Sequence, residues 1–167
     1  MLPRRCVSSV HLVRAALASC DSALSETSIR VDRLKLAKRL WRANADDGMD
    51  FGFEVESPLH HGDAVFTTLH TRYVIRQLPE PLLEIALDPQ PAAAAVLGWI
   101  VGNLHFVIEA QAARLLAPDD AALRQSLERL GISFRATVAV FQPHRLAAAV
   151  AHSHAPATEH PFIRPPR

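Results

Sequence analysis

The side-chain pattern changes its period near the middle of the chain, and this change constrains the fold more than any other feature. Before residue 78, apolar and polar residues alternate in places, as in Phe51-Gly52-Phe53-Glu54-Val55, which is typical of half-buried strands. Later, apolar residues recur at helical spacing, as at Leu123, Leu127 and Leu130. The two prolines of Leu78-Pro79-Glu80-Pro81 indicate a hinge between the halves. The sequence therefore predicts an α+β fold.

The first half, residues 1–78, is predicted to form a small all-β domain. Two turns support this prediction, at Asp46-Asp47-Gly48 and in segment 58–63 with Gly62, because Asp and Gly tolerate positive φ. The Ala- and Ser-rich segment 11–25 is expected to hold a turn or a short helix. The expected strands are residues 5–10, 36–44, 51–55, 64–69 and 72–78.

The second half, residues 82–141, is predicted to be a ferredoxin-like domain of order β-α-β-β-α-β. Its expected strands are 82–87, 106–108, 113–116 and 132–141. Asp88 is expected to cap the first helix, whose first turn accepts Pro89 and Pro91, and Gly102-Asn103 to end it. Pro118-Asp119-Asp120 is expected to open the second helix, and Gly131 to end it.

Residues 142–167 are predicted to form a flexible extension, because they contain five prolines and little periodicity. Four of the nine histidines lie here, at positions 144, 152, 154 and 160. Neutral imidazole is a common ligand of zinc, copper and nickel, and His152 and His154 can chelate one ion if the backbone adapts. The alternative is a solvated tail whose histidines bind nothing.

Other histidines are weaker metal-site candidates. His105 follows a predicted helix end, where a backbone-bonded turn histidine is the alternative to a metal ligand. His60, His61 and His70 fall in predicted turns, where exposure without metal is the simpler interpretation. Cys6 and Cys20 do not indicate a disulfide framework, and we expect two reduced thiols in a cytoplasmic protein.

The composition and motifs exclude several function classes. A net charge of +1 gives no reason to expect nucleic acid or an anionic membrane as partner. No apolar run reaches the roughly 20 residues of a membrane-spanning helix, and His11 and Arg14 interrupt the N-terminal apolar stretch that an export signal would need. Phosphate loops, HExxH pairs, CxxC pairs and nucleophile elbows are missing. We therefore predict that the chain is not an enzyme.

Several short motifs in a fixed order resemble the urease accessory protein UreE family. They are Lys38-Arg39-Leu40-Trp41-Arg42, Asp47-Gly48, Phe51-Gly52-Phe53, Leu59-His60-His61-Gly62-Asp63, Glu80-Pro81-Leu82-Leu83-Glu84 and Gly102-Asn103-Leu104-His105, before a histidine-bearing tail. The Gly-Asn-x-His segment is the most specific of them, although the family often has Arg where this chain has Leu104.

The resemblance implies a cytoplasmic nickel metallochaperone. It implies that the β domain of residues 1–78 binds partners and that residues 82–141 form a homodimer. It further implies that His105 binds Ni(II) with its copy from the second chain, and that His152 and His154 of the 142–167 tail add ligands. Nickel would then pass to the urease apoprotein complex through the accessory GTPase UreG.

Two alternatives to a nickel carrier remain open from the sequence. Histidine sites also take Zn(II) and Cu(II), so nickel itself is not dictated by the residues. A protein- or peptide-binding scaffold with incidental metal affinity is the other function we consider. A metal-dependent hydrolase would need a carboxylate beside the metal, and Glu109 is better interpreted as a strand residue.

Overall fold

The computed structural model describes residues 9–143, which form both helices and strands, so the α+β class is confirmed. No helix among these residues is long and apolar enough to cross a membrane. In chain order the elements are β1 His11–Val13, β2 Ser25–Val31, α1 Arg33–Leu36, β3 Leu40–Asn44, β4 Asp50–Glu54, β5 Ala64–Thr67, β6 Thr71–Gln77, β7 Glu80–Ala86, α2 Pro91–Asn103, β8 Glu109–Ala110, β9 Arg114–Pro118, α3 Ala121–Arg129 and β10 Arg135–Ala139.

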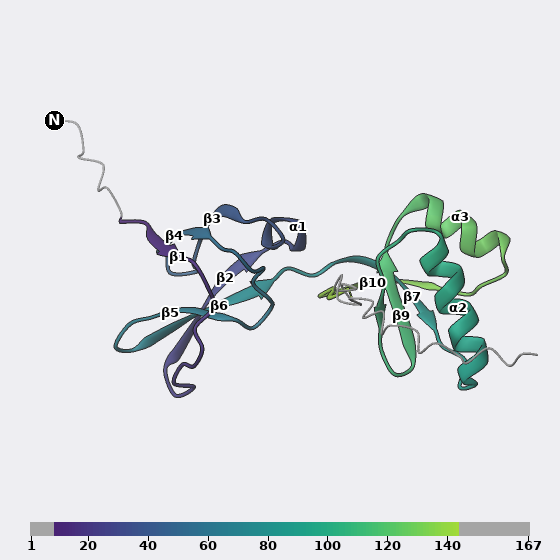
Figure 1. Ribbon diagram of the computed structural model, residues 1–167, viewed down its shortest axis with the longest axis horizontal. Coiled ribbons are helices and arrows are strands. Elements are labelled where there is room, and N and C mark those ends of the chain that lie inside the picture. The colour runs from purple at the N-terminus through teal and green to yellow at the C-terminus, as the bar shows by residue number, and fades with distance from the viewer. Residues whose placement is uncertain (1–8, 144–167) are drawn as a thin grey trace, which may run out of the picture.

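The first half contains two three-stranded sheets, in the orders β1-β4-β3 and β2-β6-β5 (Figure 1). Each sheet is mixed, because β1 runs parallel to β4 and β2 runs parallel to β6. One apolar cluster joins the sheets, and its largest side chains are aromatic. Trp41 stacks on Phe53 with ring centroids 3.6 Å apart, and Phe51 lies 5.2 Å from Tyr73.

Both predicted turns of the first half are confirmed. Strands β3 and β4 are antiparallel partners, and Gly48 in the turn between them has a φ of 89°. Gly62 has a φ of 95° in the turn before β5, and β5 pairs antiparallel with β6. Positive φ costs glycine little because it has no Cβ.

Several predicted boundaries in the first half are wrong. Ser9 and Val10 are not in a strand, β1 begins at His11, and the rest of the expected 5–10 strand lies outside the described residues. Segment 11–25 begins with β1, contains the expected turn at residues 22–23 and holds no helix. Leu36 belongs to α1 and not to a strand, because Asp32 caps that turn by accepting the Lys35 N–H at 2.7 Å.

The second half has the β-α-β-β-α-β order that the sequence predicts, with a four-stranded sheet in the order β10-β7-β9-β8. Every neighbouring pair in this sheet is antiparallel. Helices α2 and α3 pack on one face (Figure 1), where they share a core with the sheet. The fully buried members of that core include Leu83, Val101, Ala117, Leu123 and Leu127.

The second half also departs from the prediction in detail. Residues 106–108 are not a strand; β8 follows at Glu109. Strand β10 is shorter than the expected 132–141 segment, because Ile132 and Phe134 pack against the helices before the strand begins. Glu80 and Pro81 belong to β7, so the connection between β6 and β7 is reduced to Leu78 and Pro79.

Candidate metal-binding site

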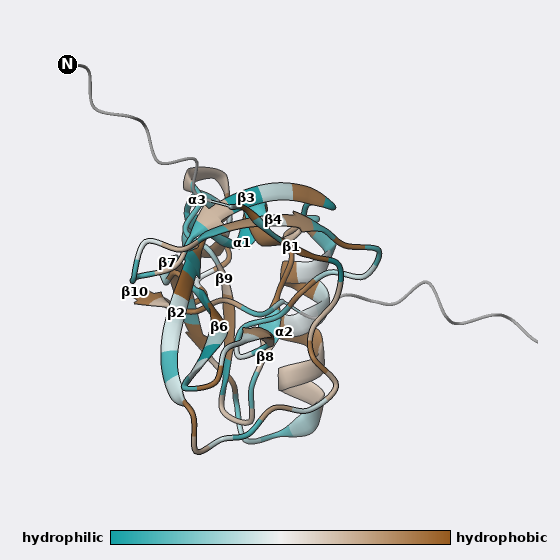
Figure 2. Ribbon diagram, turned by 90° about the vertical axis from the view of Figure 1, so that its left-hand side faces the viewer, coloured by the Kyte–Doolittle hydropathy of each residue, from teal (hydrophilic) through white to brown (hydrophobic). Residues whose placement is uncertain are grey.

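Helix α2 is apolar on all sides, and it leads directly to the most specific candidate ligand. Its sequence, PAAAAVLGWIVGN, contains no charged residue, and Figure 2 shows it mainly in pale to brown colours. Only Val101 of α2 is buried, whereas Val96 and Trp99 are 56% and 68% exposed. Helices that are apolar all round are normally buried, so α2 leaves an apolar side without cover within the described part of the chain.

The start of α2 corrects one prediction. Gln90, not Asp88, is the N-cap residue, and its side chain makes no capping hydrogen bond. Asp88 Oδ1 instead accepts the Gln90 N–H at 2.7 Å. Pro91 occupies the first turn, where its missing N–H costs no helical bond.

His105 ends α2 in the left-handed conformation. Its φ is 61°, and among the described residues other than glycine it alone has a positive φ. The His105 N–H donates to the Gly102 carbonyl at 3.0 Å, and the Leu104 N–H donates to Val101 at 3.2 Å. Gly102 and Asn103 are the last two residues of α2, as the sequence predicts, but the left-handed conformation falls on His105 and not on either of them. Many helices are followed by a residue in the left-handed conformation, usually glycine, whose N–H donates to a carbonyl of the last turn.

The imidazole of His105 is available for a ligand. The residue is exposed, and residues 9–143 offer its ring no hydrogen-bond or ion-pair partner. The left-handed conformation costs an L-residue about 1–2 kcal/mol relative to the right-handed one. A non-glycine residue in such a conformation often marks a functional position.

Glu109 connects the His105 turn to the end of the described chain. It lies four residues after His105, so their Cα atoms are within about 14 Å of each other. Glu109 Oε1 accepts from Gln111 Nε2 at 2.7 Å, and Oε2 accepts the backbone N–H of Gln142 at 2.5 Å. Gln142, close to the end of the described residues, is therefore tied to a side chain of β8.

The remaining described histidines lie in the first half, where three of them contact neighbouring residues of the fold. His60 Nδ1 lies 3.6 Å from Asp63 Oδ2, and His61 Nδ1 accepts the Gln77 N–H at 3.2 Å. The His11 ring packs 4.7 Å from the Phe66 ring, centroid to centroid. His70 is exposed in the turn before β6.

No group of three or more His, Cys, Asp or Glu residues within 9–143 is arranged to hold a metal ion. Within residues 9–143 of one chain, His105 therefore belongs to no such group of potential metal ligands. The other predicted ligands, His152 and His154, lie outside the described residues, as do His144, His160 and Cys6. Cys20 is a half-buried free thiol.

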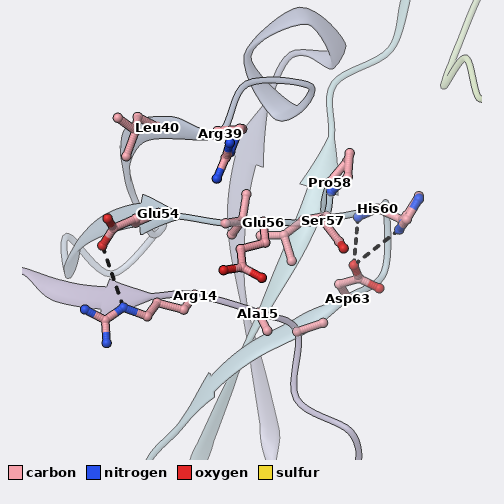
Figure 3. A pocket seen from close by; sticks show the side chains of 13 residues that line it. Arg14, Ala15, Arg39, Leu40, Glu54, Glu56, Ser57, Pro58, His60 and Asp63 are labelled. Carbon is pink, nitrogen blue, oxygen red and sulfur yellow. Dashed lines mark hydrogen bonds and ion pairs between the residues drawn. The ribbon is translucent and has the colours of Figure 1, made fainter.

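A second surface feature is a groove in the first half, with a volume of about 850 Å³. It opens where the segment after β1 and the segment after β4 separate (Figure 3). Arg14 is paired with Glu54 at 3.6 Å along its rim. The side chains of Arg39 and Glu56 point into the groove and have no partner among residues 9–143. The groove offers one charge of each sign to a partner.

The perturbed carboxylates have structural roles away from His105. The Met49 backbone N–H and then the Tyr73 hydroxyl hold the pKa of Asp47 below its usual value. The Arg124 guanidinium donates to both Asp119 oxygens, at 2.5 and 2.6 Å, and lowers the pKa of that carboxyl. The same hydrogen bonds tie Tyr73 to the turn between β3 and β4, and Arg124 to the segment before α3.

Comparison with known proteins decides the family. The family model described as UreE urease accessory protein, C-terminal domain, matches residues 80–162. The urease accessory protein UreE of Chelativorans sp. is 30% identical over 146 residues, which cover 86% of this chain and 90% of the relative. The chain belongs to the UreE family. This is a family of urease accessory proteins and not of enzymes.

Two further relatives have the same name. The UreE protein of Nitrosococcus oceani is 31% identical over 110 residues, 65% of each chain. That of Lysinibacillus sphaericus is 26% identical over 129 residues, covering 75% of this chain and 84% of the relative. The UreE family model begins at Glu80, where β7 begins, and its matched range includes both His105 and the tail histidines.

Sequence reasoning missed three features of this surface. The exposure of Trp99, the contact of Glu109 with Gln142 and the Arg39–Glu56 groove all depend on tertiary structure. Only the first had a signal in the sequence: a helix without any charged residue predicts that its whole surface is covered by something.

Proposed function

We propose that this chain is a homodimeric metallochaperone that carries Ni(II) for the assembly of the urease active site. Membership of the UreE family supports the role in urease maturation. The single observation that supports metal carriage is the exposed His105 imidazole, free of partners within the described residues, at the left-handed end of an apolar helix.

The proposed homodimer would supply metal ligands that one chain lacks. One His105 is a poor site by itself, because nickel needs several ligands to bind tightly. A two-fold axis near the end of α2 would bring a second imidazole to the same ion. The exposed Val96 and Trp99 lie on the same helix, so the contact that pairs the chains would also cover its apolar side.

His152 and His154 are the proposed auxiliary ligands. His152 lies ten positions after Gln142, and ten residues of chain reach at most about 36 Å. The Gln142 N–H donates to the side chain of Glu109, which follows His105 by four residues. Both tail histidines can thus reach an ion at His105 without unfolding the domain.

The chemistry of the ligand set suits a carrier. Imidazole sites also take Zn(II) and Cu(II), and copper binds more tightly than nickel to a given site, so supply and geometry must select the cargo. Protonated histidine cannot ligate, so we expect nickel affinity to fall as the solution is made more acidic.

The first β domain, within residues 1–78, is the proposed partner-binding part. Its groove presents Arg39 and Glu56 without partners of their own among the described residues. We propose that this domain engages the urease apoprotein complex or the GTPase UreG in the cytoplasm, while residues 82–141 dimerise and hold the metal.

Calorimetric titration of the full chain with Ni(II) tests this function. His105→Ala should abolish the tightest binding event, and the double variant His152→Ala/His154→Ala should weaken it. His70→Ala is the matched control, because His70 is an exposed turn histidine in the first half. Unchanged binding in His105→Ala would reject the shared site.

The same groove favours the second candidate, a protein- or peptide-binding scaffold with incidental metal affinity. The two functions separate in one measurement. A wild-type chain that binds Ni(II) more weakly than micromolar, yet binds the urease apoprotein without metal, would favour the scaffold.

A further inference from the structure

The connection between the two halves of the molecule has little freedom to turn. It consists of Leu78 and Pro79, and the Leu78 N–H donates to the Val31 carbonyl at 2.8 Å, which extends the pairing of β6 with β2. The ring of Pro79 fixes its own φ and keeps the preceding residue in an extended conformation. The hinge that the sequence predicts is therefore short and stiff.

Phe141 ties the end of the described chain to the second half. Its side chain is fully buried and packs against Leu82 and Leu116. These two leucines lie on the sheet face opposite α2 and α3, because their strand neighbours Leu83 and Leu115 belong to the core beneath the helices. Figure 1 shows this yellow-green end of the described chain between the two halves of the molecule. Phe141 is therefore an anchored part of the second half that the first half can contact.

Two residues of the first half make that contact. The guanidinium carbon of Arg33, on α1, lies 5.1 Å from the Phe141 ring centroid, within the range of a cation–π interaction. Gln77, at the end of β6, is 6% exposed, and its Nε2 donates to the Phe141 carbonyl at 2.6 Å. Leaving a buried amide or carbonyl without its partner is costly, so this hydrogen bond favours the observed arrangement of the halves.

Arg33 also binds the start of the second half. Its Nε and one terminal nitrogen donate to the two carboxylate oxygens of Glu80, the first residue of β7, at 2.7 and 3.0 Å. The two side chains are only 24% and 27% exposed. A two-point pair of this kind fixes direction as well as distance. One guanidinium thus contacts the second half at its first strand and at the ring that follows its last strand.

We propose that Arg33, Gln77, Glu80 and Phe141 form a clasp that holds the two halves in one fixed orientation. The clasp adds a second attachment beside the 78–79 connection, and it prevents the relative motion that is usual for domains joined by a single connection. A partner held in the groove of the first half would then face the second half in one direction. The inference does not depend on the proposed metal site, because no clasp residue is one of its ligands.

Distances between two spin labels, measured by electron paramagnetic resonance in the full chain, test the clasp. One label is attached at Leu69→Cys in the first half and the other at Leu130→Cys in the second, since both positions are exposed. Cys6→Ser and Cys20→Ser first remove the native thiols. We expect a single narrow distance population when the clasp residues are unchanged.

Single substitutions should open the clasp. Arg33→Met removes the cation and the two-point ion pair while keeping a long side chain, and Gln77→Met removes the buried donor. We expect either change to broaden the distance distribution at least about twofold, because the halves can then move about the 78–79 connection. Arg33→Lys keeps the cation and should broaden it less. Arg30→Met is the matched control, because Arg30 pairs with Asp46 within the first half.

Several results would overturn the clasp. They are a broad distribution before any clasp residue is changed, a narrow one that survives both Arg33→Met and Gln77→Met, and equal broadening in the Arg30→Met control, which would indicate a general loss of structure. If Arg33→Met fails to fold, Glu80→Gln removes one charge from the same ion pair and carries the same expectation. Nickel titration of His105→Ala is a separate test, so failure of the clasp leaves the proposed function standing.

Discussion

Helices α2 and α3 pack on the same face of one sheet, yet within residues 9–143 only α3 has a capped start and a polar outer side. Asp120 caps α3 by accepting from the Ala122 and Leu123 N–H groups, and the buried Leu127 locks its inner side. Helix α2 has no side-chain cap, no charge, and an exposed Trp99.

The difference between the two helices indicates where the described part of the molecule leaves apolar surface to be buried. An amphipathic helix such as α3 is stable with one side in water, whereas a helix apolar all round gains most from burial. Among the described residues, the helix left uncovered is the one that precedes His105. We therefore expect a functional site at the helix that departs most from the usual amphipathic pattern.

The largest expected effect sharpens the claim that α3 is locked in place. Leu127→Ala removes a fully buried side chain and should lower the free energy of unfolding by about 2–5 kcal/mol. Urea unfolding measures it. Leu130→Ala, in an exposed residue at the end of α3, should change it by less than about 0.5 kcal/mol. A loss from Leu127→Ala as small as the control's would contradict the comparison.

The next prediction can break the claim about α2. Trp99→Glu would place a carboxylate in the proposed apolar contact, and self-association should weaken at least about tenfold, since burying an unpaired charge is costly. Sedimentation velocity over a concentration series measures this. Leu130→Glu is the matched control on α3. A wild-type chain that stays monomeric, or a dimer that Trp99→Glu leaves intact, would show that α2 does not pair.

The two N-caps provide a smaller contrast. Asp120→Ala removes an oxygen that satisfies two backbone N–H groups, so it should destabilise by about 1 kcal/mol. Gln90→Ala removes a side chain without a capping bond and should change stability by less than about 0.5 kcal/mol. Thermal unfolding of both variants compares them. Equal losses would mean that Gln90 contributes to the start of α2 in another way.

The backbone at the end of α2 gives an effect of similar or smaller size. Since His105 has a φ of 61°, His105→Gly should be more stable than His105→Ala by about 0.5–1 kcal/mol, because alanine keeps the unfavourable conformation. Chemical unfolding of the two variants without metal measures this. The opposite order would exclude a left-handed residue at this position.

The smallest effect concerns charge. The pKa of Asp119 is lowered by Arg124, so this pair's contribution to stability is present above the unfolded carboxyl's value, about 3.9, and is lost as the pH falls through the lower folded value. Asp119→Asn should flatten the acid limb of the stability curve. An unchanged curve would mean that the pair adds nothing in solution.

Much of the second half could be predicted from local patterns. The cap at Asp120, the Leu123–Leu127 spacing and the glycine at position 131 all act within a few residues, so α3 and the β-α-β-β-α-β order follow from sequence alone. The hairpin at Gly48 was predictable for the same reason.

The rest could not be predicted because its causes are distant in the chain. Strand β2 was missed, and its partner β6 lies 46 residues later, at Ser25 against Thr71. The left-handed residue after α2 was expected at glycine or asparagine, which prefer that conformation, and it is His105. At the site, the motif pointed to His105, but only the folded chain brings Glu109 to Gln142.

The parallel pairing of β2 with β6 has a consequence for synthesis of the chain. Ser25 cannot pair until Thr71 has been synthesised. At about 5–20 residues per second, the ribosome needs about 2–9 s to make the intervening segment. During that time β2 exposes unpaired backbone groups, which other strands can capture. In the second half, Glu84 of β7 pairs with Arg135 of β10, 51 residues later, so the four-stranded sheet is likewise complete only after its last strand has emerged.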